Sequence, residues 1–220
     1  MIKKNAVLTL PNGKLIELPV LKGSIGPDVL DITSLYQQSS MFTFDPGFTS
    51  TGSCKSSITF IDGDKGTLLH RGYRIEDLAE NSSFLETAYL LMYGELPNNE
   101  LKKQFVESIT MHTMLNEQIS NFYRGFRDNA HPMAILCGVS GAMAAFYHDS
   151  TDINNKEQRK IASYRLIAKM PTIAAMAYKF SIGQPFVYPK NSLNYSENFL
   201  NMLFSVPAEE YEINPVFSDA

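Results

Sequence analysis

The chain has 220 residues, of which 44% are hydrophobic, and its formal net charge is −4 at pH 7. This length allows one large domain or two small ones, and the apolar fraction is ordinary for a globular protein. The acidic balance and the lack of any block of like charges argue against a nucleic-acid partner. No apolar run reaches the roughly 18 residues of a membrane span, so we expect no membrane partner.

Cysteine and histidine are sparse in this sequence. Cys54 and Cys137 are far apart and lack metal-ligand spacing, so we expect free thiols in a reducing cytoplasm. The histidines, which also lack such spacing, are His70, His112, His131 and His148. The sequence therefore predicts no metal site and a cytoplasmic protein.

The N-terminal third of the chain is predicted to consist of strands and loops. Segments 7–10 and 15–18 are mainly apolar, and between them Asn12 and Gly13 supply the positive φ angles of a tight hairpin turn. The segment that follows is rich in Gly, Ser, Thr and Pro, and within it we expect one helical turn at 29–35.

A second hairpin is expected before the helical part of the chain. Its strands are 57–61 and 67–70, and its turn, 62–66, reads Asp-Gly-Asp-Lys-Gly. This turn begins like a calcium-binding loop, but Thr67 and Tyr73 stand where that loop needs glycine and glutamate. We therefore predict a hairpin turn and not a calcium site.

After residue 74 the apolar period changes from 2 to 3.6, which predicts helices. Ser83 and Glu86 match a capping box at the start of the first helix, and Gly94 is typical of its end. The expected apolar faces of the next two helices are Leu101, Phe105, Ile109 and His112, then Leu115, Ile119, Phe122 and Phe126.

Three further helices follow. One begins at His131 and Pro132, since proline suits the first helical position, and it is apolar or small nearly all round. We therefore expect this helix to be buried against several neighbours. A longer helix follows residue 155, and Pro171 should bend or split it. The last helix covers about 196–205, so the predicted fold class is mainly α with a small N-terminal β region of two hairpins.

Self-contained catalytic motifs are absent from the sequence. It has no G-x-G-x-x-G, no P-loop and no G-x-S-x-G elbow. The clearest functional pattern is Arg165 and Lys169, which lie four residues apart and hence on one helical face. Two interpretations stay open: a solvated basic face, or an anion site where two cations converge on phosphate or carboxylate. Tyr147 and His148, which end the preceding helix, could face this pair.

Longer stretches have a distinctive order and spacing. They are 42–51 (FTFDPGFTST), 58–66 (ITFIDGDKG), 144–150 (AAFYHDS), 169–175 (KMPTIAA) and 178–185 (YKFSIGQP). From Leu8 to Pro215 the chain resembles the N-terminal half of bacterial citrate synthases. Its long N-terminal β region resembles the hexameric, NADH-sensitive form found in Gram-negative bacteria.

The resemblance implies an acyltransferase of the tricarboxylic acid cycle, which condenses acetyl-CoA with oxaloacetate to give citrate and CoA. In that family an aspartate removes a methyl proton, one histidine stabilises the enolate and another assists attack on the ketone. None of the histidines here follows a glycine, as the family's Gly-x-Gly-His motif requires, so no catalytic residue carries over. We expect an inactive fragment, with residues 1–73 as the β and loop region and 74–220 as the first part of the helical large domain.

One functional site of the family falls within this chain. Hexameric members are inhibited by NADH, so the resemblance implies NADH as an allosteric inhibitor, acetyl-CoA and oxaloacetate as substrates, and no cofactor. It also implies a homo-oligomer, either a dimer or a hexamer of dimers. Met111 replaces an arginine and Ala208 a cysteine of the family, which removes one cationic contact. The residues at matching NADH positions are Tyr147, Arg165, Lys169, His112, Thr113 and Met114.

Two alternatives stay open. The first is a 2-methylcitrate synthase-like fragment, which would keep the family and change the acyl-CoA. The second is a non-catalytic oligomerising or regulatory helical module. An encoding DNA that continues in frame past Ala220 would argue against the second alternative.

Overall fold

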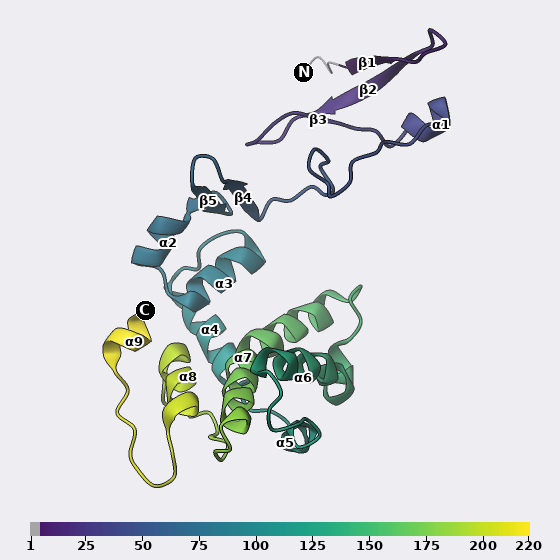
Figure 1. Cartoon of the computed structure of the whole chain (residues 1–220). Helices are drawn as coiled ribbons and strands as arrows, with labels where there is room; N and C mark the ends of the chain where they lie inside the picture. The colour runs from purple at the N-terminus through teal and green to yellow at the C-terminus, as the bar shows by residue number, and fades with distance from the viewer. Residues whose placement is uncertain (1–4) are drawn as a thin grey trace. The chain divides into compact units, whose positions relative to one another are not determined.

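The structure, a computed structural model, describes residues 5–220. The chain divides into two compact units, one ending at Leu96 and the other beginning at Pro97 (Figure 1). Of the described residues, those in the six strands all lie in the first unit, and the longest helices lie in the second. This confirms a mainly helical fold with a small N-terminal β region. The domain boundary expected at residue 73 stays a prediction, and the last strand ends at Arg74.

The first sheet contains the predicted N-terminal hairpin. β1 (Asn5–Thr9) and β2 (Leu15–Leu21) pair in antiparallel register, and Gly13 in the turn has a φ of 81°. Glycine adopts this left-handed conformation without the steric cost that other residues meet. The small core of this hairpin consists of Leu10, Ile16, Leu18 and Leu35.

A third strand stands where the sequence suggested a helical turn. β3 (Val29–Leu30) pairs with the far edge of β2, and helix α1 (Leu35–Ser39) begins only afterwards. The expectation of a helical turn at 29–35 is therefore wrong. The Asp31 carboxylate accepts the N–H of Thr33 at 3.0 Å, and such a local turn competes with helix formation.

The second sheet confirms the second predicted hairpin. β4 (Thr59–Asp62), β5 (Thr67–His70) and β6 (Tyr73–Arg74) pair in that order, all antiparallel. At the turn the Asp62 carboxylate accepts the N–H of Lys65 at 3.1 Å and pairs with its ammonium group at 2.9 Å. The acidic side chain thus closes the turn itself.

Two short helices complete the first unit. They are α2 (Ile75–Asn81) and α3 (Phe84–Tyr93). The capping box is confirmed, because Ser83 Oγ accepts the N–H of Glu86 at 3.3 Å and the Glu86 carboxylate accepts the N–H of Ser83 at 2.9 Å. Gly94 ends α3 at a φ of 94°, as expected for a helix C-terminus.

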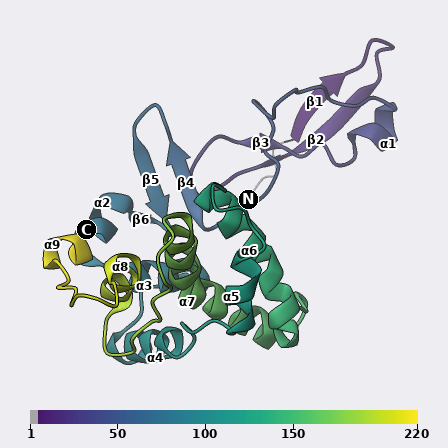
Figure 2. The same ribbon diagram turned by 60° about the horizontal axis from the view of Figure 1, so that its bottom comes forward.

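The second unit is organised around one long helix, α7. Its helical segments are α4 (Asn99–Thr110), α5 (Gln118–Tyr123), α6 (Pro132–Phe146), the 3-10 turn η1 (His148–Ser150), α7 (Lys156–Ser181), α8 (Tyr195–Phe204) and α9 (Pro215–Asp219). Helices α4, α6 and α8 all pack against α7, and Figure 2 shows α6 beside it. Over residues 5–220, no helix is both long enough and apolar enough to cross a membrane.

Helix α6 begins as predicted but is buried on one face only. The side chain of His131 accepts the N–H of Met133 at 3.1 Å and so caps the helix. Ile135, Val139 and Met143 pack into the main core, whereas Met133 is 62% exposed. Helix α6 packs on α5, η1 and α7, as expected of a helix with several neighbours, but these contacts leave part of its apolar surface exposed.

The predicted apolar faces are partly displaced by one position. Leu115 and Ile119 are buried as expected, but the next buried residue is Tyr123, while Phe122 is 41% exposed. The Tyr123 hydroxyl donates to the backbone carbonyl of Ile173 on α7 at 2.9 Å. Spacing alone could not distinguish the two aromatic residues, because the hydroxyl's acceptor lies on a distant helix.

Pro171 does not split α7, which runs unbroken from Lys156 to Ser181. Proline lacks an N–H, so the carbonyl of Ile167, four residues earlier, receives no hydrogen bond from within the helix. The hydroxyl of Tyr195, at the start of α8, donates to this carbonyl at 2.9 Å. Burial raises the pKa of Tyr195 to about 12. A neighbouring helix thus replaces the missing intrahelical bond.

A buried lysine connects the C-terminal parts of α7 and α8. Lys179 is 1% exposed. Its ammonium group donates to the carbonyl of Ser205, just after α8, at 2.8 Å and to the side chain of Gln184 at 2.6 Å. Burial lowers the pKa of Lys179. The charge is therefore stabilised by neutral oxygens at the end of a helix.

Candidate functional site

Arg165 and Lys169 project from the middle of α7, one helical turn apart. Asn155 caps the start of the helix, since its side-chain oxygen accepts the N–H groups of Glu157 and Gln158 at 3.0 and 3.2 Å. Lys169 is 4% exposed, and the side chain of Arg165 is 17% exposed. The interpretation of this pair as a solvated basic face therefore does not describe the structure.

The ammonium group of Lys169 holds the segment that follows α4. It donates to the carbonyl of His112 at 2.6 Å and also to the carbonyl of Met114. On the same helix, the hydroxyl of Thr172 donates to the carbonyl of Thr113 at 3.0 Å. Three successive backbone carbonyls are thus fixed by two side chains of α7.

Burial makes Lys169 an unusual cation. Loss of hydration, and secondarily repulsion from Arg165, lowers its pKa to about 8 from an ordinary 10.5. Burying an ammonium group disfavours the charged form, and the carbonyl oxygens offset only part of that cost. Lys169 remains mostly protonated at neutral pH, and its charge faces the loop carbonyls.

Tyr147 lies at the centre of the cluster. Its ring centre is 5.1 Å from the guanidinium carbon of Arg165 and 4.9 Å from Nζ of Lys169. At these distances the negative face of the ring attracts both cations. The Tyr147 hydroxyl accepts the N–H of Asn116 at 3.0 Å, which also fixes the segment before α5. One aromatic side chain thus orders two cations and a loop.

The guanidinium group of Arg165 already binds an anion of the protein. Its Nη1 and Nη2 donate to the two carboxylate oxygens of Asp149 at 2.6 and 2.9 Å, and Nη1 also donates to Ser150 Oγ at 2.9 Å. The hydrogen bond lowers the pKa of Asp149 and raises that of Arg165. This two-oxygen geometry is the one by which arginine recognises carboxylate and phosphate.

The side chains of the loop point less clearly to a ligand. His112 Nδ1 lies 2.6 Å from the carbonyl of Ser108 in the last turn of α4, so this nitrogen carries the proton. Met111 and Met114 are 66% and 48% exposed. His112, Thr113 and Met114 therefore enter the cluster through their carbonyl oxygens.

The structure brings all six predicted residues into one connected cluster. We call it the α7 cation cluster: Tyr147, Arg165, Lys169, His112, Thr113 and Met114. Its nucleotide-binding role stays a prediction. Ala208, the other position at which the sequence departs from the family pattern, lies exposed in the segment between α8 and α9.

Sequence reasoning missed the polar residues that hold the cluster together. Asp149 and Ser150 come two and three residues after Tyr147, within the distinctive segment 144–150. An acidic residue so close to a tyrosine that was expected to face two cations was the signal that could have identified Asp149. Thr172 had a weaker signal, its position three residues after Lys169 on the same helix. Asn116 takes part through its backbone N–H, which residue type cannot reveal.

The remaining histidines and the cysteines do not build a second site. His131 caps α6, and His148 is exposed in η1. Cys54 and Cys137 are free, as expected, and both are exposed. Within residues 5–220, His, Cys, Asp and Glu side chains do not gather in the groups of three or more that a metal ion would need.

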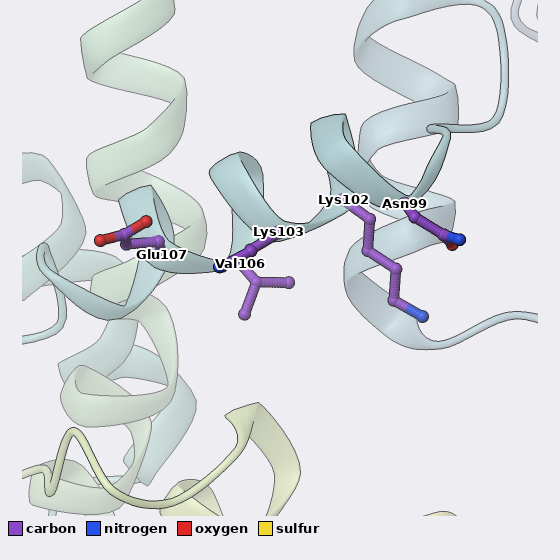
Figure 3. A pocket seen from close by; sticks show the side chains of 5 residues that line it. All are labelled: Asn99, Lys102, Lys103, Val106 and Glu107. Atoms are coloured by element: carbon purple, nitrogen blue, oxygen red, sulfur yellow. The ribbon is translucent and has the colours of Figure 1, made fainter.

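A hollow of about 500 Å³ lies along the outer face of α4 (Figure 3). It is lined by Asn99, Lys102, Lys103, Val106 and Glu107. All five residues belong to one helix, so no second element converges on the space as it does in an enclosed ligand pocket. The α7 cation cluster, with its paired cations and perturbed pKa values, is therefore the stronger candidate site.

Known proteins share both the fold and the sequence pattern of this chain. The mainly helical unit and its small N-terminal sheets have a citrate-synthase-like fold. Residues 47–220 match the family described as citrate synthase, C-terminal domain. The chain belongs to the citrate synthase family.

Solved structures of thermophilic citrate synthases are similar to this chain. That from Pyrobaculum aerophilum is 30% identical, with a TM-score of 0.69 over 91% of this chain and 46% of its own. That from Thermotoga maritima MSB8 is 28% identical, with a TM-score of 0.62 over 77% and 43%. That from Thermoplasma acidophilum, in a ternary complex with carboxymethyl coenzyme A and oxaloacetate, is 27% identical, with a TM-score of 0.67 over 74% and 42%. The chain thus spans less than half the length of these enzymes.

Proposed function

We propose that this chain is the N-terminal part of a citrate synthase that condenses acetyl-CoA with oxaloacetate, releasing citrate and CoA. The family match over residues 47–220 carries the proposal. The Thermoplasma acidophilum enzyme, to which the chain is similar, was solved with a coenzyme A derivative and oxaloacetate, which supports these two substrates. We assign no catalytic role to the described residues, whose part is the framework around α7.

The reaction is tested on the complete protein with a thiol reagent that detects CoA release. Acetyl-CoA with oxaloacetate should release CoA well above a sample without protein. Propionyl-CoA, measured in parallel, addresses the 2-methylcitrate alternative, which predicts faster release with the longer acyl group. If CoA is released from neither thioester, the proposal is contradicted and a non-catalytic module is favoured.

We further propose that the α7 cation cluster is a regulatory anion site, which binds NADH as an inhibitor in a homo-oligomeric cytoplasmic enzyme of the hexameric type. The two-oxygen recognition geometry of Arg165 and the buried charge of Lys169 support this proposal. Met111 offers no charge where the family has an arginine. NADH inhibition should therefore be weak and should decrease with added salt, which screens partly exposed charges.

The site proposal is tested by NADH titration of the complete protein and of an Arg165→Ala variant. Charge-assisted hydrogen bonds contribute about 1.5–3 kcal/mol each, so the variant should bind NADH about tenfold or more weakly. Arg127→Ala, the same chemical change at an exposed arginine between α5 and α6, serves as the matched control. Equal NADH affinity in the Arg165 variant and the wild-type protein would refute the assignment of NADH to this site.

A further inference from the structure

The contact between Arg165 and Asp149 is asymmetric in exposure. The Arg165 side chain is 17% exposed, whereas the Asp149 side chain is 62% exposed. The guanidinium group is therefore held within the fold, while the carboxylate approaches it from the solvent side. A change of rotamer would return Asp149 to water at little cost, because most of its surface is hydrated already.

Arg165 would stay in place if this carboxylate left. Its Nη1 also donates to Ser150 Oγ at 2.9 Å, and its guanidinium group lies over the Tyr147 ring. Ser150 Oγ in turn donates to the carbonyl of Tyr147 at 3.1 Å, which fixes the acceptor itself. The two N–H groups that face Asp149 would therefore remain oriented for another anion with two oxygens.

We propose that Asp149 is a built-in competitor, which occupies the anion-binding face of Arg165 and must be displaced before a ligand phosphate can bind there. This inference rests on the proposed anion-binding function of the α7 cation cluster. The bound ligand gains Nη1 and Nη2 of Arg165, while Asp149 turns to solvent. Asp149 thereby sets the affinity of the site.

The competitor also sets the class of ligand. A carboxylate ligand would exchange one singly charged group for another, with no electrostatic gain at Arg165. A phosphate ester or diphosphate brings more charge and more acceptor oxygens, and the buried Lys169 adds a positive field one turn away. The arrangement thus favours phosphorylated ligands over carboxylates.

The expected size of the effect follows from competition. If Asp149 leaves Arg165 accessible about one tenth of the time, the apparent dissociation constant is tenfold above the intrinsic one. Asp149→Asn removes the charge and keeps the size of the side chain, so the affinity for NADH should rise about tenfold. Inorganic pyrophosphate, tested as a competitor of NADH, has phosphates but no nucleoside. Because the competition concerns the phosphate contact alone, its affinity should rise by a similar factor.

The experiment compares NADH binding by fluorescence in the complete wild-type protein and three variants. Asp149→Asn should bind more tightly, and Asp149→Glu, which retains a carboxylate, should stay near the wild-type affinity. Asp152→Asn is the matched control, since it removes the same charge from an exposed acid three residues away. Thermal unfolding of each variant checks that the fold is retained.

The outcomes separate this inference from the proposed function. If Asp149→Asn binds NADH equally or more weakly, while Arg165→Ala loses binding, the anion site stands and the competitor is refuted. Weaker binding by Asp149→Asn would show that Asp149 orients Arg165 for the ligand. If Arg165→Ala binds as the wild type does, both the site and its competitor are refuted. If Asp152→Asn raises the NADH affinity as much as Asp149→Asn does, the gain comes from the change in net charge alone, and the competitor is again refuted.

Discussion

The bond between Tyr195 and the carbonyl of Ile167 makes a quantitative test of how α7 tolerates Pro171. Tyr195→Phe removes only the hydroxyl and leaves the ring in place. The Ile167 carbonyl then has neither the hydroxyl nor an N–H from position 171. Leaving a buried carbonyl without a partner costs about 1–3 kcal/mol. The Ile167 carbonyl is partly buried, so we expect the free energy of unfolding to fall by the lower part of that range.

Pro171→Ala should change this cost. Alanine restores an N–H four residues after Ile167, so the carbonyl regains its partner within the helix. In the Pro171→Ala background, Tyr195→Phe should therefore cost at least about 1 kcal/mol less than in the wild type. The difference between the two costs is the coupling energy of a double-mutant cycle.

The cycle is measured by urea unfolding of the chain. Because the chain contains no tryptophan, far-UV circular dichroism and tyrosine fluorescence serve as the two probes, and coincident transitions support two-state behaviour. Tyr188→Phe is the matched control, since that hydroxyl donates to the exposed carboxylate of Glu117. Its cost should be smaller and independent of residue 171. Equal costs of Tyr195→Phe in both backgrounds would show that the hydroxyl does not replace the missing helical bond.

Two further predictions concern charge and activity. Because the pKa of Lys169 is about 8 in the folded chain, the unfolded chain binds more protons above that pH. Stability should therefore rise by up to about 1.4 kcal/mol per pH unit between about pH 8 and 9.5 from Lys169 alone. Lys169→Met should reduce this rise, leaving the contribution of Lys179, whose pKa is also lowered, whereas the exposed Lys160→Met should not change it. Above about pH 10 the raised pKa values of Tyr123 and Tyr195 reverse the slope, because the unfolded chain loses those protons first; urea unfolding across this pH series checks both signs. The 220-residue chain alone should release no CoA from acetyl-CoA and oxaloacetate, and release above a sample without protein would contradict this.

Local sequence rules predicted the elements whose determinants lie close together in the chain. The turn at Gly13, the Ser83 and Glu86 capping box and the start of α6 at His131 each depend on residues within a few positions. These rules also placed Arg165 and Lys169 on one helical face and Tyr147 at the end of the preceding helix, whereas Thr113 and Met114 were predicted from the family resemblance. They could not show that the 112–114 segment contributes carbonyl oxygens, because that depends on packing against α7.

The errors arose where a distant partner decides the conformation. β3 exists because β2 offers it an edge, and Tyr123 is chosen over Phe122 because Ile173 offers its hydroxyl an acceptor. Pro171 was expected to bend or split α7, and its effect on helix continuity depends on a tyrosine 24 residues later in the sequence. Periodicity reports how apolar a face is, but it does not report which element covers that face.

The two buried lysines of α7 give the helix bundle a unique alignment. Apolar side chains repeat with the helical period, so a helix can shift along its neighbours by one turn, about 5.4 Å, and still present an apolar face. An ammonium group bonded to particular carbonyl oxygens has no equivalent position one turn away. Lys169 binds the carbonyl of His112, just after α4, and Lys179, ten residues later, binds the carbonyl of Ser205, just after α8. The two lysines therefore fix the position of α7 against both helices. Sliding or rotating α7 past α4 and α8 would break these bonds and leave two buried charges without partners, which costs far more than a mismatch between apolar side chains.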